Sequence, residues 1–250
     1  MLMQRFTRLV AVAVLAASSA VSVRGEDSLL FENENRFYLA PIVGASWGTL
    51  INHEIPEPGE PREPGQTVMD GNLFTAGGAA GVALAREWGQ LRLEFEGRYR
   101  DNFGISRSGE IEKYGFVNLS VQTTDNWSTM ANAWRDFSIT NRLGIYAGGG
   151  IGAGGYGLKP SASILNSSVP LSGSTMTAFA WQAGGGVLYA LNERMSLDLG
   201  YRFYSIGPGN STLQGDIPGQ GIRSVVFNTS FDSSEMLLSL RIYEPFRSWR

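Results

Sequence analysis

The chain has 250 residues, no cysteine, one histidine and a formal net charge of −3 at pH 7. The lack of cysteine excludes disulfides, thiolate metal sites, thiol catalysis and a lipid-modified cysteine, and one histidine excludes a multi-histidine metal site. The acidic balance argues against a nucleic-acid partner, which would require a basic face. No internal repeat is present, so we expect one domain.

The N-terminal segment has the composition of a secretory signal peptide. Two arginines precede an apolar stretch, residues 9–23, which is shorter than the about 20 residues that a membrane-spanning helix requires. Cleavage after Ala20 and cleavage after Gly25 both fit the preference for small residues. We therefore predict a signal peptide over residues 1–25 and a mature domain over 26–250; an N-terminal membrane anchor is the alternative.

The next pattern along the chain is an alternation of apolar and polar residues with the period of two that is typical of β-strands. It is clearest in residues 91–100 and 195–204. Six further stretches show it in weaker form, and each stretch is about as long as a tilted strand that crosses a bilayer. The eight predicted strands cover residues 37–47, 74–84, 91–100, 127–137, 143–153, 179–189, 195–204 and 236–243.

The connections between these strands alternate between short turns and long polar stretches. Outer-membrane barrels have short periplasmic turns and longer external loops, and an even number of strands places both termini on the periplasmic side. We therefore predict an all-β protein, a single eight-stranded antiparallel up-and-down transmembrane β-barrel in the cell outer membrane, with both termini periplasmic. The four predicted external loops are residues 49–70, 101–125, 156–178 and 205–233.

With the exception of Arg135, the charged residues of these strands fall on the face opposite the apolar one. Because an arginine facing hydrocarbon costs about 2–4 kcal/mol at the bilayer midplane, the charged face must line the interior. Glycines in the second, fifth and sixth strands leave room there for long side chains and for Trp134, since eight strands enclose little space. The predicted lumen-lining charges are Arg92, Glu94, Glu96, Arg98, Asp136, Asp198, Arg202 and Arg241.

The interior charges have two interpretations. Because both signs alternate along residues 91–100 and buried charges require partners, we expect a salt-bridged plug; a gated ion path is the alternative. Arg135 is an exception, since it falls on the apolar face close to a predicted short turn. We expect its side chain to extend to the lipid headgroups.

Four stretches of the chain carry a family resemblance, which extends over about residues 36–246. They resemble strands of the opacity-protein and OmpA-like small outer-membrane barrels of Gram-negative bacteria. The resemblance implies contact with outer-membrane lipid and lipopolysaccharide. It also implies a barrel-assembly machinery that recognises a C-terminal aromatic residue, whereas here Phe246 is followed by Arg247, Ser248, Trp249 and Arg250. The four stretches are residues 130–137, 145–152, 179–187 and 196–203.

Three other motifs have ordinary explanations. Residues 150–155 contain G-x-G-x-x-G, but they lie in an alternating strand with no helix after it, so we expect a glycine-lined strand and no dinucleotide site. His53 and Glu54 lie in a proline-rich stretch, where we expect a solvated histidine. Five Asn-x-Ser/Thr sequons are interpreted as polar loop composition: Asn118, Asn126, Asn166, Asn210 and Asn228.

The sequence favours a structural or surface-interaction role in which the loops present a binding surface to an extracellular ligand. We predict no catalytic, cofactor-binding or metal site, no cofactor and no enzymatic activity. The first alternative is a narrow porin-like channel for small solutes or ions. A lipid-modifying barrel enzyme that uses His53 and a soluble ligand-carrying barrel are two further alternatives.

Overall fold

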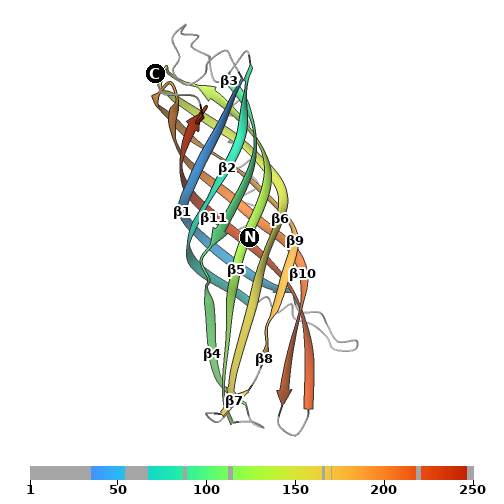
Figure 1. Ribbon diagram of the computed structural model, residues 1–250. Helices are drawn as coiled ribbons and strands as arrows, with labels where there is room; N and C mark the ends of the chain where they lie inside the picture. Colours follow the sequence, from blue (N-terminus) through green and yellow to red (C-terminus); the bar gives the residue numbers. More distant parts are fainter. Residues whose placement is uncertain are drawn as a thin grey trace.

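The computed structural model describes residues 35–53, 67–86, 89–111, 115–164, 167–169, 171–217 and 221–246, and most of them form β-strands (Figure 1). Within these ranges, no helix is long and apolar enough to cross a membrane. The strands are β1 (Arg36–His53), β2 (Thr67–Arg86), β3 (Gly89–Arg100), β4 (Gly104–Ile111), β5 (Gly115–Ser138), β6 (Leu143–Ile164), β7 (Ser167–Val169), β8 (Leu171–Ser172), β9 (Ser174–Asn192), β10 (Met195–Ile217) and β11 (Gly221–Tyr243).

Eight strands close into a ring in which all neighbours are antiparallel. The order around the ring is β1, β2, β3, β5, β6, β9, β10 and β11, and β11 pairs with β1. The short strands lie outside this order: β4 pairs with β5 beyond the end of β3, β7 pairs with β6, and β8 pairs with β10. The ring confirms the predicted eight-stranded barrel and leaves no open edge around its wall.

The strands are longer than the sequence predicts, and they extend mainly at one end of the barrel. β5 begins at Gly115 instead of residue 127, and β10 continues to Ile217. The ranges 101–125, 156–178 and 205–233 are mostly strand, which corrects the expectation of loops there. Figure 1 shows the resulting hairpins extending from the lower end of the barrel. We call this end the hairpin end.

The opposite end of the barrel carries the short connections. β5 and β6 are joined by residues 139–142, and β9 and β10 by residues 193–194. The end of β11 lies here too, because Ile242 pairs with Met195 directly after the turn at residues 193–194, and the start of β1 lies beside it, because Tyr38 pairs with Tyr243. We call this end the short-turn end; it is uppermost in Figure 1.

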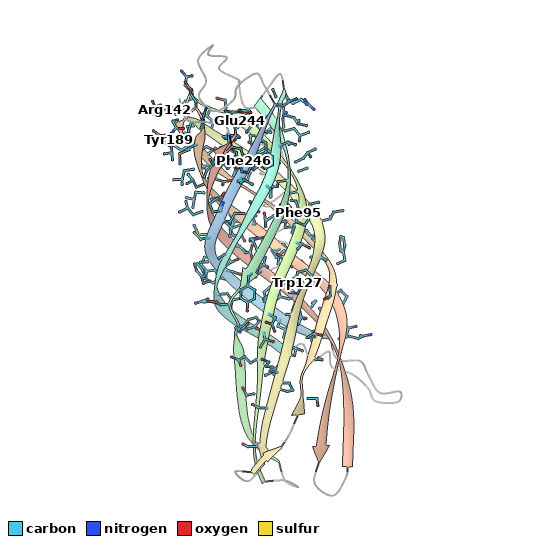
Figure 2. All side chains as sticks on the ribbon, viewed as in Figure 1. Phe95, Trp127, Arg142, Tyr189, Glu244 and Phe246 are labelled. Carbon is cyan, nitrogen blue, oxygen red and sulfur yellow. The ribbon has the colours of Figure 1, made fainter. Side chains whose placement is uncertain are left out.

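The strand alternation separates two kinds of surface. The outer wall carries large apolar side chains, such as Phe95, which is 62% exposed, while charged residues such as Arg92 are almost fully buried. Figure 2 shows Phe95 on the middle of the wall, Trp127 nearer the hairpin end, and Tyr189 and Phe246 near the short-turn end. A protein that folds in water has the reverse arrangement, with charged groups outside and apolar groups inside.

Candidate functional site

The candidate site is the interior of the barrel, where charged side chains gather. All eight charged residues that the sequence places there are buried, with exposed fractions between 0% and 8%. Four of them alternate along β3, from Arg92 to Arg98, because the period of a strand sends every second side chain to the same face. The others come from β5, β10 and β11.

Asp136 is the centre of a cluster nearer the short-turn end. Its carboxylate accepts hydrogen bonds from Nε of Arg92 at 2.7 and 2.9 Å and from Nε2 of Gln90 at 2.7 Å. Arg241 lies 3.6 Å from the same carboxylate and donates to Asp198. Two carboxylates and two guanidinium groups therefore neutralise one another, as buried charges require.

Glu94 connects this cluster to the rest of the interior. Its carboxylate accepts hydrogen bonds from the Tyr38 hydroxyl at 2.6 Å, from Nε1 of Trp134 at 2.7 Å and from Nδ2 of Asn132 at 3.0 Å. Arg92 forms an ion pair with it at 3.6 Å. Donors from β1, β3 and β5 thus converge on one buried carboxylate.

A second cluster lies on the hairpin side of Glu94. Arg98 donates to both Glu96 and Glu235, and Arg202 also donates to Glu96. Nε of Arg100 donates to Glu235 at 2.6 Å. Each of these two carboxylates is therefore held by two guanidinium groups, and strands that are far apart in the sequence are joined across the interior.

Two amides complete the link between the clusters. Gln182 accepts a hydrogen bond from Nη2 of Arg98 at 2.7 Å and donates to Oδ1 of Asn132 at 2.7 Å. Asn132 donates in turn to Glu96 at 3.1 Å and to Glu94. We call the ten charged residues of both clusters the inner charged network; it has five carboxylates and five guanidinium groups, from Arg92, Glu94, Glu96, Arg98, Arg100, Asp136, Asp198, Arg202, Glu235 and Arg241.

Beyond Arg100, towards the hairpin end, the interior becomes mainly apolar, with buried threonines such as Thr229 beside the rings. The ring of Phe231 lies 5.9 Å from that of Phe103, 6.2 Å from that of Tyr156 and 6.4 Å from that of Tyr204. The guanidinium of Arg100 lies 3.9 Å from the Tyr204 ring centre, so the two regions are in contact. We call the buried cluster the apolar layer; it consists of Leu50, Leu73, Phe103, Met130, Tyr156, Leu158, Met176, Ala180, Tyr204, Ile206 and Phe231.

Inward-facing glycines lie opposite the bulkiest inner side chains. Gly148 pairs with Trp134, and Gly184 pairs with Arg202. A Cβ at Gly148 would lie 2.2 Å from the backbone oxygen of Ala133 and 2.9 Å from the Trp134 ring. The lack of a side chain at these positions leaves the space that tryptophan and arginine occupy inside a narrow barrel.

The sequence interpretation missed two charged members of the network. Arg100 alternates with the other charges of β3, but the predicted interior set ended at Arg98. Glu235 directly precedes the predicted eighth strand, which starts at Met236, and its alternation with Leu237 would have identified it. Arg100 already lay on the charged face of the predicted strand 91–100, and extension of the last predicted strand by one residue would have added Glu235.

The remaining sequence motifs stand apart from this interior. Residues 150–155 lie within β6, in agreement with the predicted glycine-lined strand. His53 ends β1, and its backbone pairs with Asn228; Glu54 and Asn166 lie outside the described residues. Asn126 is buried and faces the interior.

Besides Phe95 in the middle of the wall, exposed and half-buried aromatic side chains lie at two levels of the outer surface. Phe37 and Phe246 stack at 6.4 Å near the short-turn end. Towards the hairpin end, Tyr99 pairs with Trp127 across β3 and β5, and Trp47 lies on β1. Aromatic girdles of this kind mark the two interfaces of a membrane barrel with water.

Comparison with protein families gives a match over most of the chain. Residues 9–231 match the family described as outer membrane protein beta-barrel domain. Uncharacterized proteins of Brucella abortus and Brucella suis are each 34% identical over 90 residues, 34% of this chain and 32% of the relative. The chain therefore matches about a third of the length of these curated relatives.

Several solved structures resemble the chain at low sequence identity. The outer membrane protease OmpT of Escherichia coli has a TM-score of 0.54 at 9% identity, with 85% of this chain and 98% of that chain covered. Neisserial surface protein A gives 0.38 at 16% identity, with 82% and 96% covered. The attachment invasion locus protein of Yersinia pestis gives 0.37 at 12% identity, with 82% and 98% covered.

A closed antiparallel ring with an apolar wall, two aromatic levels and a charged interior is a transmembrane β-barrel, in which every backbone polar group of the wall is paired inside the lipid. The chain belongs to the outer membrane protein β-barrel family. Its location is the outer membrane, where the wall contacts lipid.

Proposed function

We propose that the protein is an outer-membrane anchor with a closed interior, whose long hairpins present a binding surface to a ligand outside the cell. The filled interior supports this proposal most directly. In the inner charged network, every carboxylate is bound to at least one guanidinium group. Next to it lies the apolar layer, whose aromatic rings pack against one another and which contains no charged residue; the hydroxyl of Tyr156 within it is bonded to Thr229 at 2.8 Å.

In this proposal the short-turn end and both termini face the periplasm. Residues 1–25, which lie outside the described residues, are a signal peptide that is removed after export. The hairpins of β4 with β5, β6 with β7, and β10 with β11 continue beyond the aromatic level of Tyr99 and Trp127. They form the external surface, with lipopolysaccharide as neighbour, and the assembly machinery is a transient partner.

An inserted epitope tag tests this orientation. A tag inserted between Ile217 and Gly221, in the connection of β10 and β11, should be recognised by antibody on intact cells. The matched control is the same tag within residues 139–142 at the short-turn end, which should be recognised only after the outer membrane is permeabilised. The reverse pattern would contradict the proposed orientation.

Conductance tests the closed interior. The purified protein, reconstituted into a planar bilayer, should show no channel steps, because side chains of the network and the apolar layer fill the barrel. Folding is checked independently by faster gel migration of the unboiled sample. Steady conductance of the folded protein would contradict the proposal.

A narrow channel is the second candidate, and one observation favours it. Some buried polar atoms form no hydrogen bond with another described residue, among them Nη2 of Arg92, Nε of Arg202 and both side-chain polar atoms of Asn126. Such atoms would be hydrated in a conducting interior. If the barrel conducts, the current should fall in Arg98→Gln and Glu96→Gln, whose charges lie on the path. The proposal assigns the chain no catalysis.

A further inference from the structure

Arg135 is a cation on an otherwise apolar part of the outer wall. It lies on the outward face of β5 between Ala133 and Phe137, near the end of the strand at Ser138. Its side chain is half-buried, and its guanidinium lies 5.5 Å from the centre of the Phe137 ring. Neither the inner charged network nor the proposed external surface includes this residue.

Next to Arg135 the outer wall is hollowed. An open depression of about 730 Å³ lies over β1, β2, β3, β5 and β6. The small residues Ala80, Ala131, Ala133 and Gly149 form its floor, between larger side chains such as Phe95.

The strand register places the depression and Arg135 in line. Leu93 pairs with Ala133 within the depression, and Leu91 pairs with Arg135 one step towards the short-turn end. Outward residues of a strand follow one another at about 6–7 Å intervals, so the guanidinium is within reach of the rim of the depression. The apolar depression therefore ends at the cation Arg135 on the side of the short-turn end, where lipid headgroups lie.

We propose that this depression and Arg135 together form a phospholipid site, with an acyl chain in the depression and the phosphate at the guanidinium. Charge complementarity selects this occupant, because a guanidinium fits a phosphate with paired hydrogen bonds. Among the described outward residues of the five surrounding strands, between the two aromatic levels, there is no carboxylate. The same wall of a second copy would therefore offer Arg135 no anion.

Lipid retention tests the site with defined probes. Dimyristoyl phosphatidylglycerol, or phosphatidylcholine with the same chains, is added to the full mature protein in neutral detergent micelles, and bound lipid is counted by native mass spectrometry. The wild type should retain phosphatidylglycerol. Arg135→Gln should weaken its retention about tenfold, the loss expected for one charge-assisted contact.

Paired variants separate the two halves of the site. Ala133→Phe fills the depression and should weaken retention in the same way, whereas Ala45→Phe on the outward face of β1 should not. Arg194→Gln, in the turn between β9 and β10, is the control for loss of a cation near the same end. Faster migration of each unboiled sample shows that the variant is folded.

Three results would overturn the proposal. Arg135→Gln could retain phosphatidylglycerol like the wild type. Phosphatidylcholine could be retained as well as phosphatidylglycerol, with no effect of Arg135→Gln on either lipid. Ala133→Phe could convert a dimer to a monomer without a change in bound lipid, in which case the occupant is a second copy of the chain.

Discussion

At the scale of single residues, the interior depends on charges that cannot lose a partner. Glu235 is fully buried and accepts hydrogen bonds from both Arg98 and Arg100. If the charge of Glu235 is removed, the two guanidinium groups lose the carboxylate that they share while they remain buried. Removal of one member of a buried ion pair costs far more than loss of a pair in water.

Glu235→Gln should therefore lower the free energy of unfolding by about 3–5 kcal/mol. Urea unfolding of the protein in lipid vesicles, followed by tryptophan fluorescence, measures the change. Glu193→Gln is the matched control, since Glu193 is exposed in a short turn, and it should unfold like the wild type. Equal unfolding of both variants would mean that the network contributes nothing to stability.

Space inside the barrel leads to a second prediction at this scale. Gly148→Ala should destabilise the barrel by about 1–3 kcal/mol, because the added methyl group must displace the Trp134 ring or the backbone next to it. Gly97→Ala is the control: its Cβ would meet no heavy atom within 4 Å on the outer wall, and it should be neutral or slightly stabilising. The same unfolding assay compares them, and equal effects would contradict the packing argument.

At the scale of the strand, the outward face is defined by what lipid tolerates. Leu199→Arg, near the middle of the membrane-spanning part of β10, should cost about 2–4 kcal/mol. Leu191→Arg, at the end of β9, should cost about 0–1 kcal/mol, because its side chain reaches the headgroups. Unfolding in vesicles checks both, and equal costs would show that depth in the membrane does not govern this face.

Lipid on the outside and a confined space on the inside constrain both faces of a membrane-spanning strand. These constraints explain which parts of the strands could be predicted from sequence. Where the wall crosses lipid, one face must be apolar and the other is confined, so β3 and β10 alternate strictly. The hairpin extension β4 carries mixed polar residues like those of a loop, whereas the first half of β5 alternates, with Val117, Leu119 and Val121 each followed by a polar residue. The alternation at residues 117–122 could therefore have predicted this part of β5, whereas β4 gives no such signal and forms a strand by pairing with β5.

Irregularities in the ladders are another part that no pattern predicts. The pairing of β5 with β6 shifts between Thr124 and Trp127, and Asp125 there has a φ of 52°. The pairing of β10 with β11 shifts between Ile206 and Gly209. Such bulges interrupt the period of two, so a strand predicted by alternation ends where the bulge begins.

The sequence predicts which residues line the candidate site, but it does not predict which of them form hydrogen bonds or ion pairs with one another. Alternation identifies Arg92 and Asp136 as facing the same side of their strands. It cannot show that they bond to each other, or that Tyr38 binds Glu94 from 56 residues away, because those contacts depend on the register and on the curvature of the closed ring. Trp134 was placed inside from the same alternation, and its bond to Glu94 emerges only from the fold.

At the scale of the whole molecule, the protein is organised for a solvent that forms no hydrogen bonds. The closed ring pairs the backbone groups of its wall, and the apolar side chains that an aqueous fold would bury cover its outside. The charges that an aqueous fold would expose neutralise one another within. The proposed closed interior and the proposed outer-wall lipid site both depend on this arrangement.

Two neighbouring residues of β11 test the arrangement most directly. Leu238 is 43% exposed and Ser239 is 5% exposed, and neither belongs to the inner charged network. Because the chain has no cysteine, Leu238→Cys and Ser239→Cys can each carry one nitroxide label in lipid vesicles. Oxygen concentrates in the acyl chains, so it should enhance the spin relaxation of the nitroxide strongly at position 238 and weakly at position 239. Strong relaxation at 239 with a shielded label at 238 would contradict the account.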